Sequence, residues 1–264
     1  MKRRLLTKDF LDERLVPELE TDTVQYFDHI RRYLFAQQFV CGRAVLDIAC
    51  GTGYGSNILR LGRPKQVIGI DISREVLAYA AAQWGIAGFV RGDANALPVK
   101  ARSLDVIVSF ETLEHLMEPQ RFLLEAARVL KPDGDLILST PNRNVVSLGS
   151  TKPFSPYHTF EPTYAELKML LQEAGWTIVE MRGLIHSSRM EAMLSSSIAR
   201  PFSRSGGQIA WAAYTRKWVR ALLPRALYEW QSQVRRIPEF SIADSVLTEN
   251  ATETSNYFVV RCKP

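Results

Sequence analysis

A glycine-rich turn is the first group of residues in this chain that could bind a ligand. The turn begins at Gly51, in the string GTGYG, after an apolar strand expected at 44–48 and before a helix expected at 56–61. Glycines let the backbone approach a ligand closely, and the unpaired N–H groups at the start of a helix attract an anion. A ligand that carries a carboxylate or a phosphate would therefore fit this turn.

Two carboxylates flank the turn. Asp71 follows the strand expected at 66–70, twenty positions after Gly51, where an acid can accept hydrogen bonds from ribose hydroxyls. Asp47 lies beneath the turn, where its charge disfavours a pyrophosphate and attracts the amino group of an amino acid. The nicotinamide fingerprint places its third glycine five residues after its first, whereas the interval here is four. The pattern favours a nucleoside joined to an amino acid, and an NAD-dependent oxidoreductase remains the rival interpretation.

The string VLDIACGTG, residues 45–53, resembles the glycine motif of class I S-adenosylmethionine-dependent methyltransferases. The resemblance covers about residues 26–174, and the strings STPNR and YFDHIRRYLFA are similar to small-molecule O-methyltransferases of bacterial glycan and quinone pathways. It implies S-adenosyl-L-methionine as the cofactor. It also implies a Rossmann-like α/β fold, with a seven-stranded, mostly parallel sheet and an antiparallel final strand.

The resemblance implies cofactor contacts at the carboxyl ends of successive strands. Asp93 and Ala94 would meet the adenine, although Asp93 could instead serve only as a turn or helix cap. Phe110 and Glu111 would lie against the methionine portion. Arg32 would pair with the cofactor carboxylate, unless it lies on a solvated helix face. The complete expected set is Arg32, Asp47, Ala49, Gly51, Gly53, Asp71, Ile72, Asp93, Ala94, Phe110 and Glu111.

Two histidines are candidates for a general base. His158 lies in a loop that borders the acceptor pocket in the resembling family, and it is the preferred base, against the alternative of an ordinary structural histidine. His115 follows the strand expected at 104–110 and could be a base or could fix its loop through a local hydrogen bond. We expect no metal ligands, because Cys41, Cys50 and Cys262 show no paired spacing typical of zinc sites or disulfides.

Composition and charge indicate an ordinary globular protein with one basic segment. Of the residues, 46% are hydrophobic and 23% are charged. Between Arg182 and Glu239 ten Arg or Lys face three Glu, a net +7 against +5 for the whole chain. Because the basicity is local, nucleic-acid binding is disfavoured. The N-terminal string MKRRLLTKDF precedes no apolar stretch, so we expect a cytoplasmic protein without a membrane span.

Alternating apolar strands and helices between 44 and 138 predict a parallel α/β sheet. We expect an N-terminal helical region at 1–43, a methyltransferase core at 44–184, a basic helical insertion at 185–240, and a final strand region at 241–264. The insertion would be a lid, a homodimer element, or a peripheral contact with a membrane or a lipid-linked substrate. The expected strands are 44–48, 66–70, 88–90, 104–110, 135–140, 176–181 and 256–262, and the expected helices are 56–61, 74–84, 119–130 and 163–174.

These expectations lead to one function and its rivals. The chain would transfer a methyl group to a small-molecule acceptor, at a hydroxyl of a sugar, a lipid-linked glycan or a quinone-like phenol. The alternatives are an N-methyltransferase acting on an amine, the NAD-dependent oxidoreductase, and a methyltransferase-like module that has lost turnover.

Overall fold

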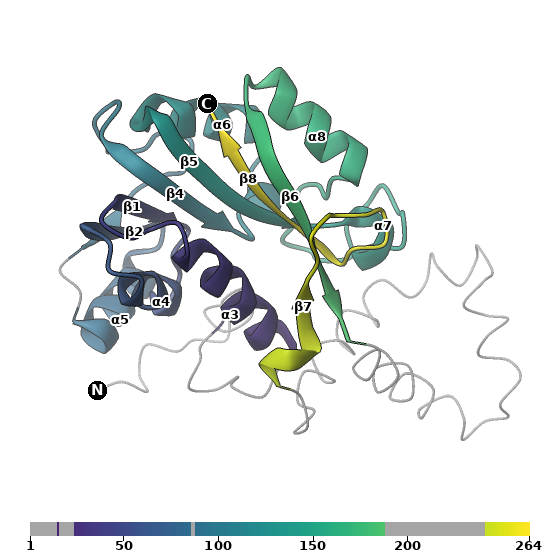
Figure 1. The fold of residues 1–264 in the computed structure, drawn as a ribbon, viewed down its shortest axis with the longest axis horizontal. Coiled ribbons are helices and arrows are strands. Elements are labelled where there is room, and N and C mark those ends of the chain that lie inside the picture. The colour runs from purple at the N-terminus through teal and green to yellow at the C-terminus, as the bar shows by residue number, and fades with distance from the viewer. Residues whose placement is uncertain (1–14, 16–23, 86–87, 188–240) are drawn as a thin grey trace, which may run out of the picture.

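The computed structural model describes residue 15 and residues 24–85, 88–187 and 241–264. These residues form a mixed α/β sheet of eight strands with helices on both faces (Figure 1). The expected regions at 1–14, 16–23 and 188–240, which include most of the basic insertion, lie outside the described residues. Within the described ranges, no helix is long and apolar enough to cross a membrane.

The first five strands run parallel, and the α/β alternation of the sequence predicted this arrangement. Their order at this side of the sheet is β3-β2-β1-β4-β5. Crossover helices connect β1 to β2, β2 to β3 and β4 to β5, whereas residues 92–103, which connect β3 to β4, hold no helix. The strands are β1 Ala44–Ile48, β2 Gln66–Asp71, β3 Phe89–Arg91, β4 Leu104–Phe110 and β5 Leu130–Pro141, and the helices are α4 Tyr54–Leu61, α5 Arg74–Trp84 and α6 Pro119–Val129.

The far side of the sheet holds β8 Tyr257–Lys263, β6 Thr177–His186 and β7 Ser245–Leu247. Strand β8 inserts between β5 and β6 and is antiparallel to both, which confirms the predicted antiparallel final strand. The predicted number of seven strands is one too few. The additional strand is β7, which pairs antiparallel with the end of β6 and has only three residues, too few for a clear alternation.

Two predicted boundaries are wrong. Strand β5 begins at Leu130 rather than at 135, because Leu130 pairs with Leu104 and the Lys131–Gly134 segment occupies an irregularity in the β4–β5 register. Strand β6 continues to His186 rather than ending at 181, because its last residues pair with β7. Proline and glycine marked a break in the regular pairing, but they did not mark the start of the strand.

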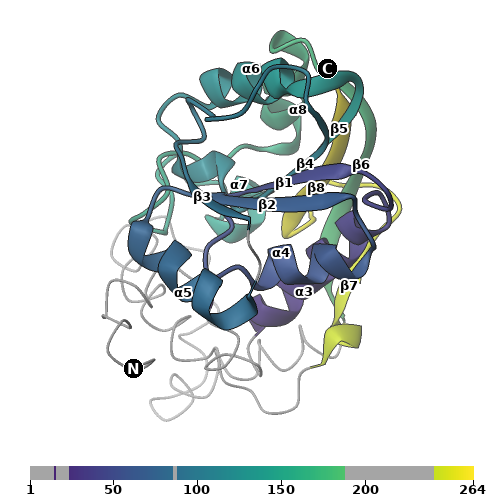
Figure 2. The same cartoon turned by 90° about the vertical axis from the view of Figure 1, so that its left-hand side faces the viewer.

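Helices cover both faces of the sheet, which Figure 2 shows edge-on. Helix α3 Val24–Gln37 lies with α4 and α5 on one face, and α6 lies with α8 Tyr164–Glu173 on the other. Alternate residues of a strand belong to the core layers on opposite faces. Val106 and Val108 of β4 pack toward α3 and α4, whereas Ile107 packs toward α6 and α8. The core layers on both faces therefore pack against the same strand, β4.

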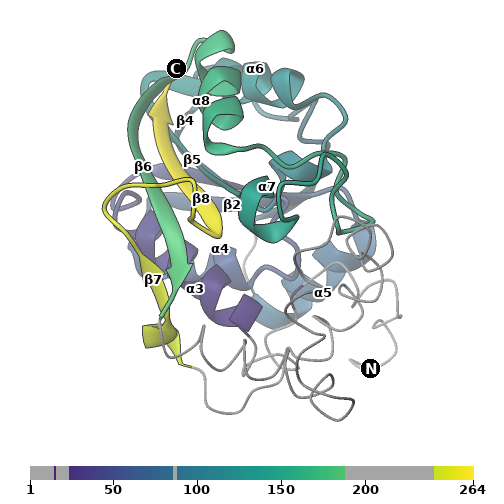
Figure 3. The ribbon, with the colours of Figure 1, turned by 90° about the vertical axis from the view of Figure 1, so that its right-hand side faces the viewer.

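Hydrogen bonds join the loop after β5 to the loop before β8. Figure 3 shows α7 Arg143–Val146 beside the start of β8. The contact there is specific, because the side-chain amide of Asn142 donates to the carbonyl oxygens of Glu253 and Ser255, at 2.9 and 2.8 Å. The asparagine of the STPNR string thus ties the carboxyl end of β5 to the loop before β8.

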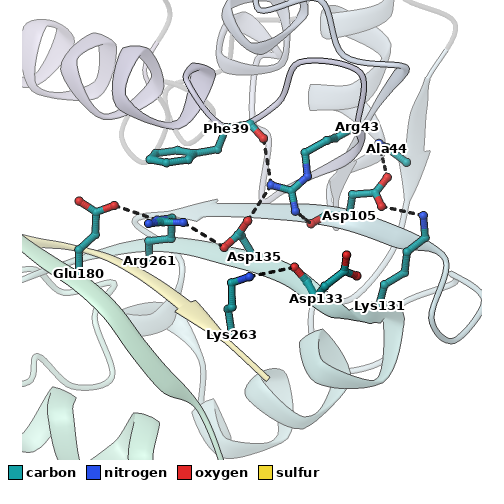
Figure 4. Close-up of polar contacts among 10 residues, drawn as sticks. All are labelled: Phe39, Arg43, Ala44, Asp105, Lys131, Asp133, Asp135, Glu180, Arg261 and Lys263. Atoms are coloured by element: carbon teal, nitrogen blue, oxygen red, sulfur yellow. Dashed lines mark hydrogen bonds and ion pairs between the residues drawn. The ribbon is translucent and has the colours of Figure 1, made fainter.

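The amino ends of the parallel strands carry a network of ion pairs (Figure 4). Arg43 contacts Asp135 at 2.6 Å, and Asp135 contacts Arg261 at 3.4 Å. Arg261 in turn contacts Glu180 at 2.8 Å, so the pairs join the segment before β1 to β5, β8 and β6. Each acid of this network lies beside an arginine, and the ion pairs link the neighbouring segments at this end of the sheet.

Candidate active site

The carboxyl end of β1 is a turn in the left-handed backbone region. Ala49, Gly51 and Gly53 have φ values of 54°, 54° and 78°. A Cβ built at Gly51 would meet nothing within 4 Å, so open space lies beside the turn at this point. A Cβ at Gly53 would lie 2.7 Å from the ring of Phe89, so close packing requires this glycine. A cofactor contact of Gly53 stays a prediction.

Asp71, at the end of β2, holds the turn in position. Its Oδ2 accepts a hydrogen bond from the backbone N–H of Gly51 at 3.0 Å, and its Oδ1 accepts one from Ser73 at 2.9 Å. The side chain of the adjacent Ile72 is 62% exposed. The structure therefore brings Gly51, Asp71 and Ile72 together at one edge of the sheet.

Asp47 lies fully buried beneath the turn, as the sequence predicted. Its two carboxylate oxygens accept hydrogen bonds from the hydroxyls of Tyr33, at 3.1 Å, and Ser56, at 2.6 Å. Burial raises the pKa of Asp47 to about 7, although both hydroxyls oppose this shift. Its described partners belong to α3 and α4, so Asp47 joins these helices to β1, and direct contact with a ligand stays a prediction.

Asp93 and Ala94 follow β3, beyond Asp71. Asp93 is exposed, and its Oδ1 accepts a hydrogen bond from the backbone N–H of Asn95 at 2.8 Å. In the described part of the chain no hydrogen bond joins the Asp93 side chain to the other expected cofactor residues. Asp93 therefore caps its own turn here, and its contact with adenine stays a prediction.

Arg32 reaches the carboxyl end of β4 from α3. It is 1% exposed, so the alternative of a solvated helix face is wrong. Its Nη1 lies 3.1 Å from Oε1 of Glu111, and its guanidinium lies 4.7 Å from the ring centre of Tyr257. Glu111 itself has a φ of 50°, an unfavourable value for a residue with a side chain, directly after the buried Phe110. The chain turns sharply at the point where Arg32, Phe110 and Glu111 meet.

Glu114 is a buried acid that the sequence interpretation did not single out. It is 0% exposed, its Oε2 accepts a hydrogen bond from the hydroxyl of Thr140 at 3.0 Å, and its Oε1 is buried without a hydrogen-bond partner among the described residues. Burial and the nearby charge of Glu111 raise the pKa of Glu114 well above its usual range. Such a group is typical of a functional site.

Both candidate histidines lie beside Glu114. Nδ1 of His158 is 2.7 Å from Oε1 of Glu161, which is 1% exposed, and Nδ1 of His115 is 3.1 Å from the carbonyl oxygen of Tyr157. The two imidazole rings are 4.9 Å apart and perpendicular. The structure thus brings the two histidines together, although no sequence pattern pairs them. Glu161 is a second missed residue, for which its position three residues after His158 was an available signal.

Comparisons with known proteins agree with this geometry. The sequence profile of a family described as a methyltransferase domain matches residues 46–138. A probable S-adenosylmethionine-dependent methyltransferase of Mycolicibacterium smegmatis is 33% identical over 197 residues, which cover 75% of this chain and 73% of that protein. A ubiquinone biosynthesis O-methyltransferase of Cupriavidus pinatubonensis is 31% identical over 165 residues, which cover 56% and 66% of the two chains.

A similar solved structure is that of an S-adenosylmethionine-dependent methyltransferase from Thermotoga maritima. It covers 97% of this chain and 99% of its own, with a TM-score of 0.60 and 20% identity. At this identity the likeness supports the fold, which is the Rossmann-like sheet predicted from the sequence.

Proposed function

We infer that this chain, which belongs to the S-adenosylmethionine-dependent methyltransferases, transfers the cofactor's methyl group to a hydroxyl of a small-molecule acceptor. Membership in this family makes the chain an enzyme with S-adenosyl-L-methionine as its cofactor, and it excludes the NAD-dependent alternative. The finer points, which are the acceptor hydroxyl and the role of each residue, rest on the geometry of the carboxyl edge of the sheet.

Two observations test whether the described residues fit the cofactor. The open space beside Gly51 leaves room for a ligand against the backbone, with Asp71 and the exposed Ile72 at its side. Arg32 is buried, its Nη1 lies at ion-pair distance from Glu111, and its Nε has no hydrogen-bond partner among the described residues, so a cofactor carboxylate could accept from Nε. The space beside Gly51 and Asp71 supports a place for the ribose, and Arg32 supports one for the carboxylate, while the adenine contact of Asp93 and Ala94 stays a prediction.

When bound, S-adenosylmethionine supplies a methyl group on a positively charged sulfur, and transfer to a hydroxyl oxygen releases the proton of that hydroxyl. His158 can accept this proton on Nε2, because Glu161 at 2.7 Å holds the proton of the neutral ring on Nδ1. The His158–Glu161 pair is the observation that carries the proposal. Proximity between acceptor and cofactor would supply most of the acceleration, roughly 7 to 11 kcal/mol.

One relative and the basic insertion support the acceptor class that we propose. A relative named as a ubiquinone biosynthesis O-methyltransferase supports oxygen as the methyl acceptor. We propose a sugar, a lipid-linked glycan or a quinone-like phenol. The basic segment at 185–240 would contact an anionic membrane or the lipid-linked part of the substrate, or would join two copies of the chain, and these roles stay predictions outside the described residues.

An acceptor screen with methyl-labelled cofactor tests the proposal. We expect transfer to phenols, sugars or lipid-linked glycans, and a loss of roughly 10² to 10⁴-fold in kcat for His158→Ala. His186→Gln is the matched control, because His186 also lies against a buried acid, Asp28, at 3.0 Å, and it stands at the end of β6, away from Glu161 and His158 in the chain.

The outcomes separate the alternatives. Transfer to amines alone would assign N-methylation, for which a neutral amine needs no strong base. Full turnover of His158→Ala on a hydroxyl acceptor would show that His158 is not the base. An unchanged kcat for His186→Gln is required before either result is interpreted.

A further inference from the structure

Three side chains beside the carboxyl edge of the sheet are arranged like the ligands of a metal ion. One ligand atom from each of Glu114, His115 and His158 lies within 4.8 Å of the others. Glu114 and His115 belong to the 3₁₀ helix η2 Leu113–His115, directly after β4, whereas His158 lies in the loop before α8. The cluster therefore forms only when these two distant segments fold together.

Backbone contacts fix the two segments against each other. The N–H of Thr159 donates to the carbonyl oxygen of Glu114 at 2.7 Å, and its hydroxyl lies 2.9 Å from the carbonyl oxygen of Leu116. His158 precedes Thr159 directly, so these bonds hold it next to Glu114. The geometry is preorganised and does not depend on a long flexible side chain.

The Nδ1 atom of each histidine contacts an acceptor of the kind that orients metal-binding histidines. A ligating histidine usually donates its other ring N–H to a carboxylate or a backbone carbonyl. Nδ1 of His158 has Glu161 at 2.7 Å, and Nδ1 of His115 has the Tyr157 carbonyl at 3.1 Å. Because both acceptors hold a proton on Nδ1, Nε2 is the nitrogen that carries the lone pair in each ring.

The carboxylate supplies the second, independent observation. Oε1 of Glu114 is buried and has no hydrogen-bond partner among the described residues, while Oε2 accepts from Thr140. A buried acceptor without a partner costs about 1 to 3 kcal/mol, and more when it is charged. A cation placed between Glu114 and the two histidines would remove this cost.

We propose that Glu114, His115 and His158 bind one divalent transition-metal ion. Two imidazole nitrogens and one carboxylate suit zinc or a neighbouring transition metal better than magnesium or calcium, which prefer oxygen ligands. Three protein ligands leave coordination positions open, as catalytic zinc sites do. Ligand atoms at about 2.1 Å from a tetrahedral metal are about 3.4 Å apart, so small side-chain rotations close the site.

The use of this ion rests on the proposed function. An acceptor hydroxyl at an open position would lie next to the strand end at Phe110 and Glu111, where the methyl donor is expected. The ion would lower the pKa of a bound hydroxyl, whose proton would pass to solvent water as the oxygen takes the methyl group, because His158 is then a ligand rather than the base. No sequence pattern indicates this site, because 43 positions separate His115 from His158 and no cysteine is involved.

Binding of Co²⁺, added without cofactor or acceptor, tests the site. We expect the full-length chain, stripped with a chelator, to bind one equivalent of Co²⁺ with a visible d–d absorption band, and Zn²⁺ to abolish the band. His115→Ala should weaken Co²⁺ binding at least tenfold. His115 is exposed, so this variant tests the ligand without disturbing the core. His186→Gln, outside the cluster, should bind as the unchanged chain does.

The outcomes also separate this inference from the proposed function. Absence of a Co²⁺ band, or equal affinity in His115→Ala, would overturn the metal site. Methyl transfer to a hydroxyl by the metal-free chain at the full rate would overturn the catalytic use of the ion and leave His158 as the base. Metal binding without transfer to any hydroxyl acceptor would overturn the proposed function and leave the site.

Discussion

The two ends of the same sheet use charge in opposite ways. At the amino ends of the parallel strands, Asp135 is 5% exposed and lies between Arg43 and Arg261. At the carboxyl ends, Glu114 is fully buried, one of its oxygens lacks a described hydrogen-bond partner, and burial together with the charge of Glu111 raises its pKa. The first arrangement pairs its charges within the fold, whereas the second holds an acid whose ionised form a bound cation would stabilise.

Left-handed backbone occurs at both ends of the sheet and does not distinguish them. Ala49, Gly51 and Glu111 have positive φ values after β1 and β4, and Arg63 and Arg102 have positive φ values before β2 and β4. The difference between the two ends therefore lies in their charges rather than in their backbone.

The largest stability effect should come from the amino end. Asp135→Asn leaves Arg43 and Arg261 without their shared acid, and we expect the free energy of unfolding in urea to fall by about 2 kcal/mol. The exposed pair of Arg121 and Glu118 is the control, since Glu118→Gln should cost about 0.5 kcal/mol or less. Affinity for S-adenosylhomocysteine should not change in either variant, and a large loss in Asp135→Asn would show that the two ends are coupled.

A smaller, pH-dependent effect should come from Asp47. Burial raises its pKa from 3.8 to about 7, so the folded chain binds this proton more tightly than the unfolded chain. The contribution of Asp47 to stability is therefore complete below about pH 4 and is lost as the pH rises toward 7. Asp47→Asn cannot lose a proton. We expect the variant to gain about 1 kcal/mol relative to the unchanged chain between about pH 5.5 and 7.

Urea unfolding at several pH values measures this gain. A constant offset caused by the altered hydrogen bonds to Tyr33 and Ser56 does not affect the slope. If the difference between the two proteins stays flat across this pH range, Asp47 is already ionised in the folded chain and the carboxyl end is less desolvated than its geometry indicates.

The sequence predicted the elements whose pattern is local. The apolar strands ending at Asp71 and Phe110 and the glycine turn at Gly51 follow from spacing within a few residues, so their positions were confirmed. The resemblance supplied the antiparallel position of β8, which periodicity alone does not specify. Strand β7 was missed because three residues carry too little periodicity.

The rest of the site depends on tertiary contacts that no local pattern encodes. Arg32 is buried because Tyr257, over two hundred positions later, covers its guanidinium. Glu114 and His158 meet because Thr159 bonds to the backbone of η2. A single sequence shows residue types but not which distant residues share a neighbour. The cluster therefore became visible only in three dimensions.

The most direct test compares one glycine from each end of β1. Gly42 and Gly51 have φ values of 70° and 54°, and a Cβ at either would meet nothing within 4 Å. Alanine at either position should therefore cost a similar 1 to 2 kcal/mol or so of backbone strain. Calorimetric titration with S-adenosylhomocysteine separates them: we expect Gly51→Ala to weaken binding at least tenfold and Gly42→Ala to leave it unchanged. Equal affinity in the two variants would contradict the assignment of the cofactor to the carboxyl end.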